Sequence, residues 1–274
     1  MSLTELFPEE DYRFQMRFQR GTPKAFFAAA ALHEAIISER RNWLRTDPET
    51  YSACLPECGA LIDEAITSLQ SWGVLADGDQ RRLSGIQKSI HRCIALGETI
   101  EPDFLLLKAD AAGQFRLLGG CVCFPSSWSL SEKVGRSLDF IHGIVPGLNL
   151  QIGKSIQSFL GKLAPEVAWL RHNWGLSRSP ELNQHPKRGL PRLSDSVRLD
   201  EVWLRVEHQA LVALPACQGV LFGIRIAVHS LAKVKSEPAA VERLIRALQT
   251  MPIEMAAYKN IEPARHTLLR LLSS

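Results

Sequence analysis

The sequence predicts an α+β fold built on one antiparallel sheet. Three features of the 274 residues lead to this class. The first hundred residues are rich in helix formers, five later runs have the aromatic and β-branched content of strands, and a helical stretch interrupts those five runs. Strands that are grouped and separated by turns pair antiparallel, with helices packed on the sheet.

An N-terminal helical region is expected over residues 1–100. The segments PKAFFAAAALHEAIISERRNWL and DPETYSACLPECGALIDEAITSLQSW consist largely of helix formers, and Leu61, Ala65 and Leu69 recur at the four-residue spacing of one helix face. We expect this region to pack on a domain formed by residues 101–274, so that the two make one compact unit.

A hairpin and two helices are expected next. DFLLLKADAAGQFRLLGGCVCFP contains two apolar, strand-like runs joined by a turn at Gly113. Ser129 and Glu132 have the spacing of a capping box, which predicts a helix that begins near Leu130. A second helix is predicted for LNLQIGKSIQSFLGKL, which follows a Pro-Gly break.

Three more strands and a helix complete the predicted fold. AWLRHNWGLS, VWLRVEHQALVAL and GVLFGIRIAVHSL are strand-like and are separated by breaks rich in proline and glycine. EPAAVERLIRALQTM returns to a helical pattern, with Val241, Leu244, Ile245 and Leu248 on one face.

Composition and charge argue against nucleic-acid and membrane partners. The formal charge of +3 and the pI near 8.6 are mild, and the basic residues Lys187, Arg188 and Arg192 lie in a proline-rich stretch that is typical of a solvated linker. No apolar run approaches the roughly 18 residues of a membrane-spanning helix, and the N-terminus has no pattern of a secretory signal.

The six cysteines predict a cytoplasmic protein with reduced thiols. They show no pair of CxxC units and no Cys/His block with zinc spacing. Cys121 and Cys123 alternate along a strand and therefore face the same side, where packing as small apolar residues is the commoner role.

His142 lies on the apolar side of the helix predicted after Leu130. It follows Leu138 by four residues, in a stripe that also contains Val134 and Ile141. A buried neutral imidazole needs a partner, because each unsatisfied group costs about 1–3 kcal/mol. Spacing alone favours a hydrogen bond to a backbone carbonyl over a metal. One imidazole is nevertheless enough for heme iron, because the porphyrin supplies four nitrogens, whereas zinc needs further ligands.

Charged residues also alternate along the strand VWLRVEHQALVALP. Arg205 and Glu207 share one face and can form an ion pair, or present a donor and a proton acceptor to a cavity. The alternative is a solvent-facing charged side of the sheet. In AWLRHNWGLS, Arg171 and Asn173 again place polar groups among tryptophans, so the two strands can line one polar pocket.

These segments together resemble the heme-dependent oxidative N-demethylases, whose heme subunit is similar to the PAS fold. The matching pieces are VCFPSSWSLSEKVGRSLDFIHGIVP, LRHNW and LRVEHQALVALP, with EPDFLLL and YSACLPECGALIDEAITSL in the expected places. The resemblance covers about residues 30–260, and its most specific part is FPSSW followed by a helix and IH-x-x-VP.

The resemblance implies a chemistry, a cofactor and partners. It implies heme b in a PAS-like pocket, activation of dioxygen, and oxidative removal of a methyl group from a small secondary amine such as dimethylamine, with release of formaldehyde. The electrons are expected from separate flavin and iron–sulfur reductase subunits, because the chain has neither a nucleotide-binding glycine fingerprint nor a ferredoxin cysteine run.

The resemblance also assigns roles to four residues. His142, in the IH-x-x-VP element, is expected to be the proximal iron ligand. Arg205 is expected to hydrogen-bond bound oxygen or a propionate, and Glu207 to handle a proton or the substrate ammonium. Arg171 is expected to hold a propionate, which a guanidinium can bind with two hydrogen bonds.

The sequence departs from the family pattern at three positions. The pattern near Glu207 runs closer to RVERQTL, whereas here His208 replaces the second arginine and Ala210 the threonine. The ligand element more often reads IHxPVP, and here Ile144 stands where proline is usual. His208 is therefore a rival axial ligand, and the lost positive charge leaves the identity of the amine open.

Two other functions remain compatible with the sequence. A PAS-like heme protein can bind or sense a diatomic gas without turnover, although the tail ARHTLLRLLSS is short for a signalling helix. A heme-free structural homologue would keep His142 as a hydrogen-bonded core residue.

Overall fold

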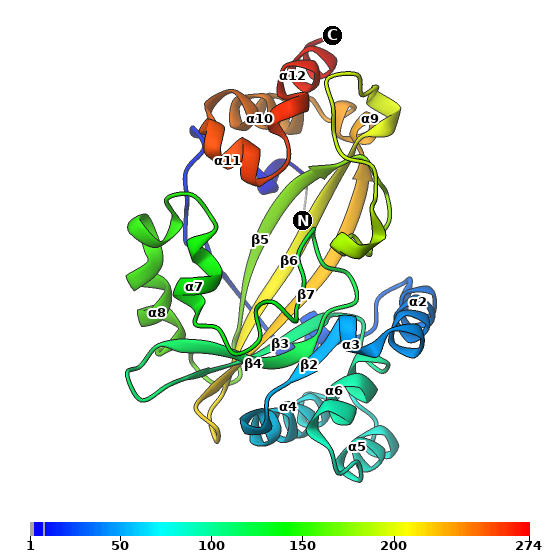
Figure 1. Ribbon diagram of the computed structural model, residues 1–274, viewed down its shortest axis with the longest axis vertical. Helices are drawn as coiled ribbons and strands as arrows, with labels where there is room; N and C mark the ends of the chain where they lie inside the picture. The colour runs from blue at the N-terminus through cyan, green and yellow to red at the C-terminus, as the bar shows by residue number, and fades with distance from the viewer. Residues whose placement is uncertain (1–2, 8) are drawn as a thin grey trace.

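A seven-stranded antiparallel sheet runs through the molecule in the computed structural model, which describes residues 3–7 and 9–274 (Figure 1). The strand order is β1-β5-β6-β7-β3-β4-β2, and every neighbouring pair is antiparallel. The strands are β1 (Gln19–Gly21), β2 (Ser52–Cys54), β3 (Asp103–Ala109), β4 (Phe115–Cys121), β5 (Ala168–Ser177), β6 (Trp203–Leu214) and β7 (Gly219–Ser230). The five predicted strands are confirmed as β3 to β7.

The hairpin of β3 and β4 has the turn that the sequence predicts. The Asp110 carboxylate accepts hydrogen bonds from the backbone N–H groups of Ala112 and Gln114, at 2.9 and 3.0 Å. Gly113 has a φ of 77°, a left-handed conformation that glycine adopts without steric cost. The chain therefore reverses over residues 110–114 and returns as β4.

Twelve α-helices are present in the part of the chain that the structure describes. They are α1 (Pro23–Phe27), α2 (His33–Thr46), α3 (Pro48–Tyr51), α4 (Gly59–Ser71), α5 (Asp77–Ser84), α6 (Ser89–Gly97), α7 (Leu138–Gly143), α8 (Lys154–Leu160), α9 (Leu231–Lys235), α10 (Pro238–Thr250), α11 (Ile253–Tyr258) and α12 (Arg265–Ser273). Six of them precede residue 100, as predicted, but the same region also contributes the short edge strands β1 and β2. None of the helices described is long and apolar enough to cross a lipid bilayer.

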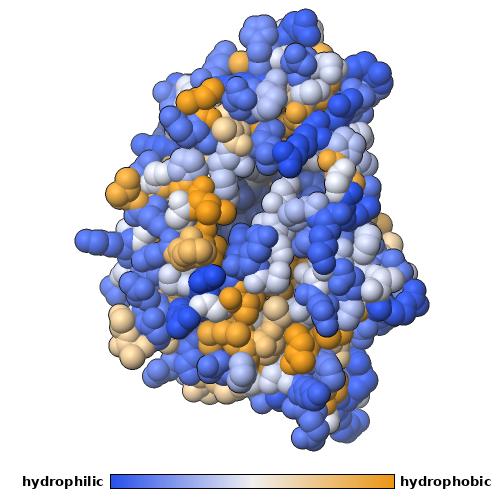
Figure 2. Space-filling view, viewed as in Figure 1, coloured by the Kyte–Doolittle hydropathy of each residue, from blue (hydrophilic) through white to orange (hydrophobic). Residues whose placement is uncertain are grey.

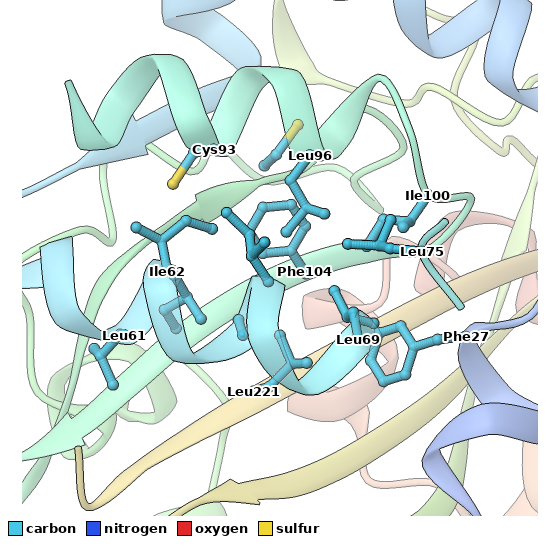
Figure 3. Packing of buried hydrophobic residues seen from close by; sticks show 14 of the residues in the cluster. Phe27, Leu61, Ile62, Leu69, Leu75, Cys93, Leu96, Ile100, Phe104 and Leu221 are labelled. Atoms are coloured by element: carbon cyan, nitrogen blue, oxygen red, sulfur yellow. The ribbon is translucent and has the colours of Figure 1, made fainter. Parts of the chain in front are cut away.

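One face of the sheet packs on helices at both of its ends. On β6 this face carries the even-numbered residues. At the end near β3, they join a cluster with Leu61, Leu69 and Leu96 from α4 and α6 (Figure 3). At the other end, Leu204 and Val206 meet α10 and α12. Residues from the first hundred positions and from the later strands therefore share one core.

The opposite face is covered only in part. Near β3 and β4 it packs against Leu130, Leu138 and Leu160, which lie in or beside α7 and α8. Further along β5 and β6 the same face carries polar side chains. The uncovered part of this face is the candidate site.

The helix predicted from Leu130 onward is shorter than expected, and that prediction was wrong. The helix α7 begins at Leu138, where the Ser137 hydroxyl caps it by accepting a hydrogen bond from the Phe140 N–H at 3.2 Å. The Ser129 hydroxyl instead pairs with that of Ser131, and Gly135 has a φ of 82°, which interrupts a right-handed helix. Residues 130–136 therefore form turns.

Candidate active site

His142 lies near the end of α7, at the edge of the uncovered sheet face. Its ring is half-buried, and no side chain or backbone group of residues 3–7 and 9–274 hydrogen-bonds to it. Burial lowers the pKa of His142 to about 4, and the positive charges of Arg171 and Lys133 act in the same direction. The ring is therefore neutral at ordinary pH and keeps a lone pair for a ligand bond.

The strands β5 and β6 bring the other predicted site residues to one face. Arg171 pairs with Gln209 and Asn173 pairs with Glu207 in the ladder, so all four side chains point to the same side. Arg205 lies two residues before Glu207 on β6, so its side chain points to the same side. Its exposed fraction is only 3%. The alternative of a solvent-facing charged side is therefore wrong for Arg205.

Glu207 is held by three neutral hydrogen-bond donors. Its Oε1 accepts from the Ser126 hydroxyl at 2.6 Å, and its Oε2 accepts from Gln209 at 2.8 Å and from Asn173 at 3.3 Å. Neutral donors orient a carboxylate and leave its charge uncancelled. Glu207 is therefore a fixed negative charge at the centre of the polar face.

Arg205 is bonded to backbone carbonyls and to Ser126. It donates to the carbonyls of Phe124 and Leu182, each at 2.7 Å, and its Nε donates to the Ser126 hydroxyl at 2.8 Å. No direct ion pair joins Arg205 to Glu207 in the described structure, because Ser126 lies between them. Burial lowers the pKa of Arg205 to about 10, well above neutrality, so the guanidinium stays charged. Its geometry is that of a positioning residue for two loops and for Ser126.

Three more cations lie around Glu207. The Arg171 guanidinium stacks over Phe18, 6.0 Å from the ring centroid, and the Lys133 Nζ lies 4.1 Å from that of Trp128. Lys259, just after α11, donates to the Trp174 carbonyl at 2.6 Å. The pKa of each cation is lowered, mainly by burial, while the charge of Glu207 opposes the shift.

The polar face therefore has an excess of positive charge. Within the described residues, no ion pair is formed by the four cations Arg171, Arg205, Lys133 and Lys259. Glu207 is the carboxylate whose charge acts on all four. Partly or fully buried cations that outnumber their shared carboxylate neighbour favour anionic ligands, because the ligand's charge replaces the lost hydration. The space-filling view shows a hollow in the middle of this face, with apolar groups along the side where α7 lies (Figure 2).

His208 does not reach this site. It projects from the opposite face of β6, and its Nδ1 lies 2.9 Å from the Nδ1 of His172. Burial lowers the pKa of His208 to about 4, with a further contribution from His172. The rival axial ligand that the sequence suggested therefore lies on the other side of the sheet from Glu207 and Arg171.

The chain matches one known family model over residues 22–269, that of "Haem-dependent oxidative N-demethylase, alpha subunit-like" proteins. The chain belongs to this family. Membership agrees with the resemblance found in the sequence and indicates a heme-dependent oxidoreductase of the N-demethylase type. The words alpha subunit in the family's description indicate an enzyme of several subunits.

The residues of the site fit a heme in their chemistry. His142 offers a neutral imidazole without a protein hydrogen-bond partner among the described residues, which suits an axial bond to iron. The uncompensated cations Arg171, Lys133 and Lys259 suit the two carboxylates that every heme b carries.

Four site residues were not found from the sequence. Ser126 lies in the loop after β4, Lys133 lies in the turns before α7, and Tyr258 and Lys259 come from the end of α11. Burial and the charge of Glu207 raise the pKa of Tyr258. Ser126 and Lys133 had a signal, because both belong to the matched piece VCFPSSWSLSEKVGRSLDFIHGIVP, whereas long-range packing brings Tyr258 and Lys259 to the site.

Proposed function

We propose that this protein is the heme-binding subunit of an enzyme that removes a methyl group oxidatively from a small secondary amine such as dimethylamine, with release of formaldehyde. The observation that carries the proposal is the neutral His142 beside half-buried cations that outnumber Glu207. Membership in the heme-dependent family supports it. The heme b that we propose would supply the binding and activation of dioxygen.

His142 would be the axial ligand to iron, and Arg171 would bind a propionate. Glu207 would bind the ammonium group of the amine, because a secondary amine is cationic at neutral pH and Glu207 is the shared carboxylate neighbour of the site's cations within the described residues. Arg205 would act through Ser126, whose hydroxyl orients the Glu207 carboxylate. The electrons would come from flavin and iron–sulfur subunits, in keeping with the family's description as an alpha subunit.

The PAS-like fold is part of the same proposal. The five strands β3 to β7 are adjacent in the sheet, in the order β4-β3-β7-β6-β5. In the sequence, α7 and α8 lie between β4 and β5. The residues that would hold the proposed heme lie on α7, which carries His142, and on β5, which carries Arg171. A cytoplasmic location is proposed as well, in keeping with six free cysteines.

A visible spectrum tests the heme proposal. Purified protein supplied with heme is expected to show a strong Soret band, which His142→Ala weakens or shifts. His208→Ala is the matched control, because that ring lies on the opposite face of the sheet, and it should leave the band unchanged. A band that survives His142→Ala and disappears in His208→Ala would contradict the ligand assignment.

Formaldehyde production tests the reaction. The heme-loaded protein, given a reductant, dioxygen and a series of methylated amines, should release formaldehyde from at least one secondary amine. Glu207→Gln keeps the shape of the side chain and removes its charge. It should therefore raise the KM for the amine and leave the Soret band unchanged. A heme spectrum without formaldehyde from any amine would instead identify a heme protein that binds a gas without turnover.

A further inference from the structure

Two neighbouring cysteines and a third that is distant in the sequence meet beside the core of the N-terminal helices. Cys54 ends β2, Cys58 ends a short 3₁₀ helix (Pro56–Cys58), and Cys93 lies on α6. Their three Sγ atoms all lie within 4.8 Å of one another. The spacing of 4 and 35 residues between them has no metal-binding pattern, so the fold alone brings them together.

The cluster has one closed side and one open side. Cys58 and Cys93 are fully buried, and Cys93 projects from α6 toward α4 on the flank of the packed core (Figure 3). The backbone of β4 closes the cluster at Gly119, where an added Cβ would lie 2.8 Å from the Cys58 Sγ. Cys54 is half-buried, which leaves a path from solvent to the sulfur atoms.

Apolar packing is the usual role of buried cysteines. The pair Cys121 and Cys123 is buried beside the ion pair of Arg40 and Asp103, and Arg40 donates to the Cys121 sulfur at 3.6 Å. Their two sulfur atoms lie 3.9 Å apart, and among the described residues no third thiol completes a cluster with them. The cluster at Cys54 differs because three thiols converge within 4.8 Å of one another. The cation of Arg92 also acts on two of them. The buried Nε of Arg92 has no hydrogen-bond partner within the described residues, although Nη1 pairs with Asp63.

We propose that Cys54, Cys58 and Cys93 form a binding site for a thiophilic divalent cation such as zinc. Zinc–sulfur bonds of about 2.3 Å in a tetrahedral site require sulfur atoms about 3.8 Å apart, so the three side chains need to move by less than about 1 Å. The fourth position, on the side of Cys54, would take water. Three thiolates and a divalent cation carry one negative charge in total, which the neighbouring Arg92 offsets in part. This site is separate from the proposed heme site.

Cadmium titration of the full chain tests the site, because cadmium–thiolate bonds have a charge-transfer absorption that histidine or carboxylate ligands lack. Protein reduced and freed of metal should develop this band and saturate at about one cadmium per chain. Cys54→Ser is the main variant, because its side chain is half-buried and the change is small. It should weaken cadmium affinity at least about tenfold and lower the saturated band.

Cys217→Ser is the matched control, since Cys217 is also half-buried but lies outside the cluster. It should keep both the affinity and the band of the wild type. Proton release on metal binding, measured by calorimetry in buffers of different ionisation enthalpy, gives a second measurement on the unaltered protein. The proposal is overturned if wild type develops no band at stoichiometric cadmium, or if Cys54→Ser keeps the band that Cys217→Ser loses.

Discussion

At the scale of single residues, the site depends on side chains whose charge is set by burial. Lys259 is the clearest case, because its Nζ contacts the Trp174 carbonyl and ring while Glu207 and Arg171 act on it from a distance. Burial lowers the pKa of Lys259 to about 8 from the ordinary value of 10.5, so this cation loses its proton at a lower pH than an exposed lysine side chain in water. The positive charge that the site offers to an anion therefore depends on pH.

Heme affinity should fall as the pH rises through about 8, because Lys259 then becomes neutral and its attraction for a carboxylate is lost. Lys259→Gln should remove this pH dependence and weaken binding at neutral pH by about 0.5–1 kcal/mol. Heme titration of the apoprotein at several pH values measures both effects. Lys162→Gln, an exposed control, should behave as wild type, and identical pH profiles for wild type and Lys259→Gln would refute the prediction.

His208 gives a prediction for stability. Its pKa is about 4 in the folded protein, against an ordinary value of 6.5 for an exposed histidine, so the unfolded chain binds more protons between these values. The stability that comes from the neutral ring is complete above pH 6.5 and is lost as the pH falls toward 4. In urea unfolding over this range, His208→Gln should therefore lose less stability than wild type. The exposed control His266→Gln should lose more than His208→Gln, and equal losses in these two variants would contradict the assignment.

How far the sequence could predict the site follows from these residues. Arg171 and Glu207 were predicted to share a pocket because strand alternation fixes the side of each residue once the strands are recognised. The contact of Lys259 with Trp174 joins residues 85 positions apart, and the close thiols at Cys54 and Cys93 depend on how α6 packs near β2. No local pattern contains such information, because these contacts come from tertiary packing.

At the scale of elements, the segment before α7 shows why a local pattern can fail. Ser129 and Glu132 have the spacing of a capping box, yet Gly135 takes a left-handed conformation three residues later. The turns at 130–136 still bury Leu130 and pack Val134 against the same cluster. The apolar spacing was therefore informative about burial, although it was misleading about the helix.

Gly135→Ala should destabilise the protein by about 1–2 kcal/mol, because a Cβ is strained at a φ of 82°. Gly143→Ala is the matched control in α7 itself, since an added Cβ there meets no atom within 4 Å. It should be neutral or slightly stabilising. Unfolding midpoints in urea measure the difference, and equal effects of the two substitutions would contradict the assigned turn.

At the scale of the whole molecule, the N-terminal helices and the later strands are joined by a buried ion pair as well as by a shared core. Arg40 of α2 is completely buried and contacts Asp103 of β3 at 2.5 Å. The same Asp103 accepts hydrogen bonds from the backbone of Cys123 and Phe124, at 2.7 and 2.9 Å. We therefore propose that residues 1–100 and 101–274 unfold as one unit.

Arg40→Met should destabilise the protein by about 3–5 kcal/mol, because it leaves the buried Asp103 without its cation. The exposed neighbour gives the control Arg41→Met, for which little change is expected. Denaturation followed by both fluorescence and far-ultraviolet circular dichroism should show one shared transition that moves to lower denaturant. Two separate transitions would show that the regions fold independently.

The link through Ser126 also restricts where a proton can reside. A hydroxyl has a single hydrogen, and because Arg205 donates to the Ser126 oxygen, that hydrogen must point to Glu207. Of the roughly four lone-pair positions on the Glu207 carboxylate, three are then filled and one on Oε1 remains free. A donor from outside this network, such as the ammonium group of the proposed substrate, therefore finds one open position on the carboxylate and can approach it from one direction.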